Sequence, residues 1–262
     1  MRKTKKVVVV KTLREWLARG EKLEPDQIVV VDYETKDPIA SGMLIKYDQT
    51  NYSNFVLDEN ELWKPGIESR GISHVVADGL TGLQFCVLEA IVVLANRTDK
   101  GTSQFEYGKA IDKMKEVVQS LCHSQFDFIL TCHFNSDKDE ITGKIREQIM
   151  VYGKALPNLI ASMMDDIYFA YCDASSGRME YYWGTNPQML LKCIRQRSFD
   201  DLPIKIPANF IQQYKGMLYP VAKKNVLIIG DVGVGKTVSV ETLPGGTVLF
   251  NFDPGGWRSL QR

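Results

Sequence analysis

The sequence predicts an α/β protein whose mostly parallel β-sheet is covered by helices on both faces. Short apolar runs alternate with amphipathic segments along the chain, which is the pattern of strands joined by crossover helices. A glycine-rich turn joins one apolar run to a helix within residues 225–242, and two other runs end in an aspartate. Late in the chain, two runs flank Ser175-Ser176-Gly177, which indicates a closing hairpin.

Each expected element follows from local composition or spacing. The expected strands or apolar runs are 7–10, which is four valines, then 28–31, 43–46, 74–78, 128–132, 167–171, 179–183, 225–229 and 247–252. Leu13, Trp16 and Leu17 share one face of a helix over 12–19. Further helices are expected at 83–95 and 105–121, in part of 59–69, over 143–164 with a break near Pro157, and from 236 to 242.

Length, charge and cysteine content restrict the class of protein. The chain has 262 residues, and its Lys+Arg and Asp+Glu counts are both 32, so any nucleic-acid contact must use a local patch. The five cysteines are odd in number and form no C-x-x-C pair, which favours a reducing compartment. No apolar run approaches the length of a membrane span. We therefore expect a cytoplasmic protein with no membrane partner.

A phosphate-binding loop is the most specific motif in the chain. Residues 225–237 form an apolar strand and then the pattern G-x-x-x-x-G-K-[ST], and a predicted helix follows. Its glycines let backbone N–H groups turn toward phosphate oxygens. The pattern predicts ATP and Mg²⁺ as ligands, with Lys236 on the β- and γ-phosphates and Thr237 on the metal. The residues expected to bind the nucleotide are Gly230, Asp231, Val232, Gly233, Val234, Gly235, Lys236, Thr237 and Val238.

Hydrolysis also requires an acidic residue that holds Mg²⁺ at the end of a neighbouring strand. Two segments, His74–Asp78 and Ile28–Asp32, have the form of an apolar strand that ends in aspartate. We expect Asp78 to be the metal residue, because a long helix and another strand with polar residues at its end follow it. Asp32 and Glu34 then belong to a solvated strand end that leads into a turn.

Two further strand ends carry candidate catalytic residues. Thr131 and His133 end the run that starts at Phe128, and the carboxyl ends of strands in open α/β sheets face the ligand. Either side chain would bond the γ-phosphate or the attacking water; a buried histidine bonded to backbone is the alternative. Asp253 ends the strand after the phosphate loop and is the candidate base, with an ordinary Asp-Pro-Gly turn as the alternative.

The order of these motifs is unusual for a P-loop ATPase. Lys236 stands close to the C-terminus, so the strands that end near Asp78 and His133 precede the phosphate loop. Most P-loop ATPases have these strands after the loop.

A rotated chain order removes this anomaly. If the order starts at Met217 and Arg262 is joined to Met1, the phosphate loop comes first and the strand of Asp253 follows it. Such circular permutation is tolerated where termini lie close and the cuts fall in loops. We therefore expect one permuted domain over 1–262, with the phosphate loop in 217–262 and the metal and sensor strands in 1–216. An N-terminal subdomain before a shortened P-loop domain is the alternative.

In rotated order the chain resembles phage-encoded ATPases of the RecA/Rad51 superfamily that are linked to single-strand annealing. Gly230–Thr237 matches the family's Walker A motif, His74–Asp78 its Walker B motif and Thr131–His133 its T-x-H strand end. Residues Phe252–Leu260 are similar to its strand that ends in an acid, Gly-Gly and an Arg-Ser-Leu run. The family usually has glutamate at the position of Asp253, which bears on the rate of hydrolysis. The resemblance implies a RecA-like P-loop NTPase core and a homo-oligomer with nucleotide near the subunit interface.

The resemblance also implies basic residues that act on a neighbouring subunit or on DNA. Leu190–Ser198 is similar to the family's late Lys/Arg-rich element, and Arg197 is the expected arginine finger, ahead of Lys192 and Arg195; a solvated basic face is the alternative. DNA would meet the loop Asn135–Arg146, whose acids offset its bases, or the basic residues at 258–262 and 2–6.

These residues together predict an ATP-hydrolysing enzyme that acts on single-stranded DNA in phage recombination or annealing, in the cytoplasm of a bacterial host. Two alternatives stay open. One is a P-loop ATPase of another assembly, such as helicase loading, packaging or defence. The other is a nucleotide-controlled scaffold with weak hydrolysis, which the aspartate at position 253 keeps in consideration.

Overall fold

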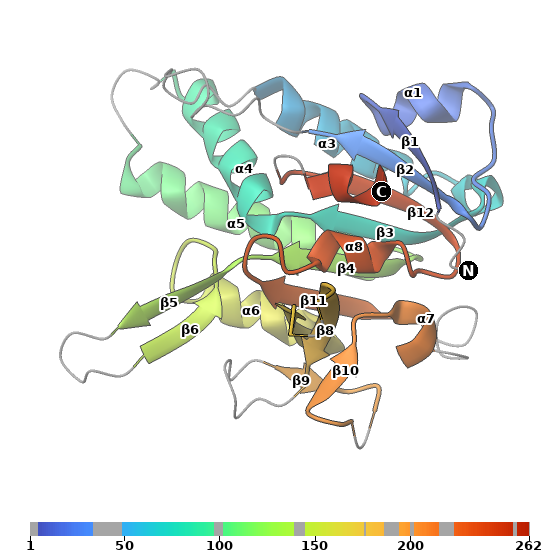
Figure 1. Cartoon of the computed structure of the whole chain (residues 1–262). Coiled ribbons are helices and arrows are strands. Elements are labelled where there is room, and N and C mark those ends of the chain that lie inside the picture. The colour runs from blue at the N-terminus through green and yellow to red at the C-terminus, as the bar shows by residue number, and fades with distance from the viewer. Residues whose placement is uncertain are drawn as a thin grey trace.

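A sheet of ten strands forms the centre of the computed structural model (Figure 1). The structure describes residues 5–33, 49–96, 102–138, 145–175, 177–185, 194–199, 202–214, 223–253 and 256–261. The strands of this sheet are β1 (Lys6–Val10), β2 (Gln27–Asp32), β3 (Ile72–Asp78), β4 (Asp127–Cys132), β7 (Asp166–Asp173), β8 (Glu180–Gly184), β9 (Arg195–Gln196), β10 (Lys205–Pro207), β11 (Asn225–Gly230) and β12 (Gly246–Asn251).

Seven neighbouring strands are parallel, in the order β1-β2-β12-β3-β4-β11-β7. Their carboxyl ends therefore lie along one edge of the sheet, which is where ligands bind in open α/β sheets. Strand β11, which precedes the glycine-rich loop, lies between β4 and β7, and its Ile228 pairs with Thr131 on one side and Tyr168 on the other. The expected mostly parallel sheet is confirmed, and strands from upstream in the chain flank β11 on both sides.

An antiparallel section continues the sheet beyond β7. Strand β8 pairs with β7, with Trp183 opposite Ala170, and β10 pairs with the far side of β8. Strand β9 pairs with the amino end of β7. The predicted hairpin is confirmed. Strands β9 and β10 are only two and three residues long, too short to show the alternation by which a strand is recognised in a sequence.

Helices cover both faces of the sheet, because successive side chains of a strand point to opposite faces. On β11, Leu227 and Ile229 point into the larger core, and Val226 and Ile228 point into the smaller one. The larger core packs against α1 (Leu13–Ala18), α3 (Gln49–Glu61), α4 (Leu80–Leu94), α5 (Gln104–His123), α6 (Leu156–Met163) and the 3₁₀ turn η1 (Ile67–Arg70). The smaller core packs against α7 (Phe210–Gln213), α8 (Lys236–Val240) and the 3₁₀ helix η2 (Gly256–Gln261).

No helix in the described ranges is long and apolar enough to cross a membrane.

The broken helix predicted over 143–164 is wrong in its first half. Ile145–Ile149 is strand β6, which pairs with β5 (Phe134–Lys138) in a separate two-stranded sheet that projects from the main sheet (Figure 1). Only α6 is helical, and Pro157 lies in its first turn, where its missing N–H removes no hydrogen bond. The proline therefore marks a helix start and not a break. The apolar run expected at 43–46 lies outside the described residues.

Gly82 of α4 meets the end of β12 and gives a test of this packing. A Cβ atom at residue 82 would lie 2.1 Å from the backbone oxygen of Phe252, and backbone cannot move aside easily. Gly→Ala normally stabilises a helix, but we expect Gly82→Ala to lower the free energy of unfolding by about 1–3 kcal/mol. Urea denaturation of the purified variant measures the change.

Gly108 of α5 is the matched control for this substitution. It is exposed, and a Cβ there would meet no atom within 4 Å. We expect Gly108→Ala to raise the free energy of unfolding by about 0.5–1 kcal/mol. Equal effects of the two substitutions would show that α4 does not press on the backbone of Phe252.

Candidate functional site

The glycine-rich loop between β11 and α8 folds back tightly on the sheet. Gly233 and Gly235 have φ values of 78° and 85°, a left-handed conformation that other residues rarely adopt. A Cβ at Gly235 would lie 2.3 Å from the ring of Tyr181, and one at Gly230 would lie 2.7 Å from the backbone oxygen of Ala170. Gly235 therefore requires glycine because of its left-handed backbone and because a side chain would clash with Tyr181. Gly230 requires it because a side chain would clash with the backbone of Ala170.

Lys236 is buried in this loop with its ammonium group held by backbone. Its Nζ donates hydrogen bonds to the carbonyl oxygens of Gly230 and Asp231, at 3.1 and 2.7 Å. Burial lowers the pKa of Lys236, while the nearby carboxylates of Asp253 and Asp78 act in the opposite direction. The loop thus holds a cation that backbone dipoles and two carboxylates stabilise, in the position where a phosphate ligand needs one.

Asp78 ends β3 and is completely buried, with one hydroxyl donor on each carboxylate oxygen. Thr131 Oγ1 donates to Oδ1 at 2.5 Å, and Thr237 Oγ1 donates to Oδ2 at 2.7 Å. Burial raises the pKa of Asp78, and these two hydrogen bonds oppose that rise. Strand β4 separates β3 from β11, so the expectation that the metal acid stands on a strand next to the phosphate-loop strand is wrong. The shared carboxyl edge nevertheless brings Asp78 to Thr237.

His133 stands directly after β4, between Lys236 and Asp253. Its Nδ1 lies 3.5 Å from Lys236 Nζ, and its Nε2 lies 3.5 Å from Asp253 Oδ2. Because the lysine can only donate, a tautomer with its hydrogen on Nε2 suits both neighbours. The side chain therefore links the ammonium of the loop to the carboxylate at the end of β12.

Asp253 reaches the site because the end of β12 lies against the end of β3. The backbone N–H of Phe252 donates to the backbone oxygen of Asp78 at 2.8 Å, and the N–H of Gly256 donates to the backbone oxygen of Asp253 at 3.0 Å. A Cβ at Gly79 would lie 2.9 Å from the Cβ of Asp253. The hydrogen bond from Gly256 to Asp253 is that of an ordinary turn. Asp253 therefore starts a turn and also lines the same cavity as Lys236.

A cavity of about 230 Å³ opens at this point. It is lined by Tyr181, Val232, Gly233, Gly235, Lys236, Thr237, Val238, Asp253, Gly256 and Ser259. Asp78 lies behind Thr237 and does not line it. Tyr181, Gly256 and Ser259 were not predicted as site residues. Gly256 and Ser259 belong to the segment Phe252–Leu260 that resembles the ATPase family, and this resemblance could have indicated them. Nothing in the sequence points to Tyr181.

The remaining expected residues are placed as follows. Asp32 lies one strand beyond β12 and accepts hydrogen bonds from Asn251 Nδ2 and Trp257 Nε1, both at 2.9 Å, away from Lys236. The backbone N–H of Arg197 donates to Asp166 Oδ1 at the amino end of β7, so Arg197 is at the opposite edge of the sheet from the loop of its own chain. Lys192 lies outside the described residues.

The residues present fit a magnesium ion that is held largely by phosphate. The described residues contain no group of three or more His, Cys, Asp or Glu side chains that could hold a metal by themselves. Mg²⁺ needs only one or two protein oxygens when a nucleotide supplies others. Thr237 Oγ1, which lines the cavity, and the Asp78 carboxylate, 2.7 Å behind it, would provide them.

Thr131 holds Asp78 in place and can be tested by mutation. Its hydroxyl accepts from the backbone N–H of Gly79 at 2.9 Å and donates to Asp78. We expect Thr131→Val to lower the free energy of unfolding by about 1–3 kcal/mol, because it leaves a buried N–H unsatisfied. Chemical denaturation at a series of pH values is the measurement.

The pH dependence of this loss has a definite sign. The lost hydrogen bond stabilised the ionised form of Asp78, so the loss should be largest above the raised native pKa of Asp78 and should shrink as pH falls through it. Thr131→Ser keeps the hydroxyl and is the matched control. A serine variant as unstable as the valine variant would show that packing of the methyl group, and not the hydroxyl, matters.

No known protein family, curated protein or solved structure matches this chain in sequence or structure comparison.

Proposed function

We propose that this chain is an ATP-hydrolysing enzyme with a RecA-like P-loop core. One observation carries the proposal: Lys236, Thr237 and Asp253 line one cavity, and two residues from strands far upstream contact them from behind. Asp78 accepts a hydrogen bond from Thr237, and His133 lies between Lys236 and Asp253. A glycine-rich loop alone is compatible with any tight turn. Here the loop is combined with the buried carboxylate of Asp78, which accepts a hydrogen bond from Thr237, and with the carboxylate of Asp253 near Lys236. Together these are the groups that phosphoryl transfer requires.

The proposed roles follow from what each group can donate or accept. The N–H groups of the loop and the Lys236 ammonium bind phosphate oxygens, and Lys236 exchanges its two carbonyl partners for them. Thr237 and Asp78 would hold Mg²⁺, which would supply positive charge to offset the charge that develops on the phosphate oxygens.

Asp253 is the proposed base for the attacking water. The water oxygen bonds to the γ-phosphorus, the bond from that phosphorus to the bridging oxygen breaks, and the water proton passes to the Asp253 carboxylate. The products are ADP and inorganic phosphate. His133 positions Asp253 through the 3.5 Å contact between Nε2 and Oδ2. Because aspartate is one methylene shorter than glutamate, we expect the water to lie close to the end of β12.

ATP turnover with and without single-stranded DNA tests the proposal. We expect Lys236→Ala to weaken ATP binding, and Asp253→Asn to retain binding but lower turnover by about 10²–10⁴-fold, the range for a positioned base. Asp112→Asn, on the exposed surface of α5, is the matched control and should change neither. Binding assays and steady-state phosphate release are the measurements.

Each outcome of that experiment favours one of the proposed functions over the others. We expect single-stranded DNA to raise turnover, because the β5–β6 hairpin starts at Phe134, directly after His133, and offers a route from a bound strand to the site. Turnover that ignores DNA would favour an ATPase of another assembly. ATP binding without turnover would favour a scaffold, and normal ATP binding by Lys236→Ala would remove the phosphate-loop assignment.

The rotated chain order is part of the proposal, and the sheet order supports it. The chain then runs β11, β12, β1, β2, β3, β4 and, after the β5–β6 hairpin, β7, and these seven strands of the main sheet lie side by side and parallel. Val7 of β1 and Leu260 of η2 both pack against the smaller core, so both ends of the described chain lie on one face of the sheet. Lys5 Nζ also donates to the backbone oxygen of Gly245 at 2.6 Å, which ties the start of β1 to the start of β12.

A rearranged gene tests the rotated order. A protein that starts at Met217 and joins Arg262 directly to Met1 should fold and bind ATP as the original chain does, because it keeps every contact of the core. Circular dichroism, thermal denaturation and ATP titration are the measurements. Opening the chain between Gly79 and Leu80 is the control that should fail, since Gly79 bonds to Thr131 there. Failure of the first rearrangement to fold would contradict the rotated order.

A further inference from the structure

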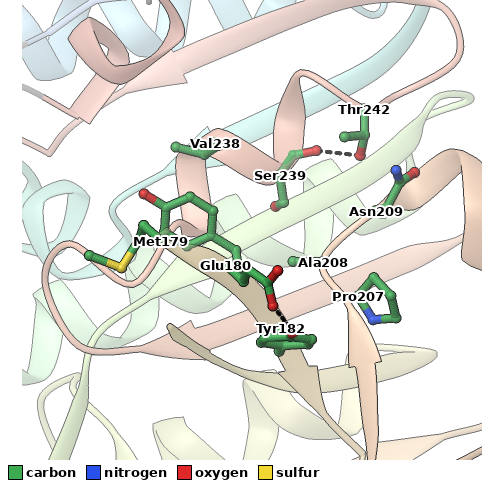
Figure 2. A pocket seen from close by; sticks show the side chains of 10 residues that line it. Met179, Glu180, Tyr182, Pro207, Ala208, Asn209, Val238, Ser239 and Thr242 are labelled. Atoms are coloured by element: carbon green, nitrogen blue, oxygen red, sulfur yellow. Dashed lines mark hydrogen bonds between the residues drawn. The ribbon is translucent and has the colours of Figure 1, made fainter. Parts of the chain in front are cut away.

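A second cavity of about 340 Å³ lies beside the candidate phosphate cavity. The two cavities share Tyr181 and Val238 as lining residues. Figure 2 shows its walls: Val238, Ser239 and Thr242 come from the α8 side, Met179, Glu180 and Tyr182 from β8 and the residue before it, and Pro207 to Asn209 from the end of β10. No role described above uses this cavity.

The Tyr181 ring separates the two cavities. It packs so closely on Gly235 that a Cβ there would lie 2.3 to 2.8 Å from three of its ring atoms. Gly235 is also the residue immediately before Lys236. The ring therefore contacts the glycine-rich loop directly and lines both cavities.

The walls combine apolar surface with a few polar groups. Val238 and Met179 are apolar, and Met179 is largely exposed. Asn209 Oδ1 accepts from the backbone N–H of Gln212 at 3.0 Å, so its amide nitrogen remains as a donor. The Glu180 carboxylate accepts from the Tyr182 hydroxyl, and both side chains lie on the face of β8 opposite Tyr181.

We propose that this second cavity binds the purine base and ribose of the nucleotide whose phosphates occupy the first cavity, with Tyr181 as the residue that selects for a base. The proposal rests on the proposed function. A flat ring with nitrogen acceptors matches the Asn209 amide, and its π face matches Tyr181. The volume of the cavity leaves room for the sugar beside the base.

Comparison of ATP with inorganic tripolyphosphate tests this assignment. Tripolyphosphate carries the phosphates alone, so it reports on the loop without the base. We expect Tyr181→Ala to weaken ATP binding by roughly 5- to 150-fold, the range for base–aromatic stacking, and to leave tripolyphosphate binding unchanged. Tyr181→Phe should keep both affinities. Tyr171→Ala is the control: it removes a ring that stacks on Tyr182 but lines neither cavity.

The contrary outcomes are distinct. Equal weakening of both ligands by Tyr181→Ala would show that the ring only shapes the loop, and unchanged ATP binding would remove the cavity as a base site. A wild-type chain that binds neither ligand would instead contradict the proposed function. If Tyr181→Ala does not fold, 8-azido-ATP crosslinked to the wild-type chain decides. Label on residues 179–182, 207–209 or 238–242 supports the proposal, and label elsewhere overturns it.

Discussion

The buried carboxylate of Asp78 joins parts of the chain that are far apart in sequence. Its two oxygens accept hydrogen bonds from Thr131 near the end of β4 and from Thr237 in α8, and its backbone oxygen accepts one from Phe252 after β12. A fully buried carboxylate without such donors is costly. The ends of β3, β4 and β12 and the start of α8 are therefore stable in this arrangement only together, and folding of the sheet also assembles the candidate site.

The same arrangement places two carboxylates and one ammonium in a small volume. Burial raises the pKa of Asp78 and lowers the pKa of Lys236, so the surroundings disfavour the charged form of each group. In a protein selected only for stability, apolar residues would serve better at these positions. The free-energy cost of burying these charged groups is consistent with a site that binds a charged ligand. His133 lies between Lys236 and Asp253, so a displacement of either side chain would also change the contact that His133 makes with the other.

Much of the secondary structure could be predicted because it is a local property. Four valines predicted β1, and the spacing of Leu13, Trp16 and Leu17 predicted α1. The β5–β6 hairpin was missed because β6 contains three polar residues in five and lacks an apolar alternation. In addition, Pro157, which lies in the first turn of α6, was interpreted as a break in one longer helix that included residues 145–149.

The glycine-rich loop, the type of sheet and the residues at strand ends could be predicted from the sequence alone, because these depend on short-range spacing and on the conformational freedom of glycine. Only the tertiary structure decided which strand ends meet. Asp78 reaches Thr237 although β4 lies between their strands, Arg197 lies at the opposite edge, and Tyr181 packs on Gly235. These outcomes depend on the order of strands in the sheet. That order arises from contacts between residues far apart in the chain, which periodicity and local motifs do not encode.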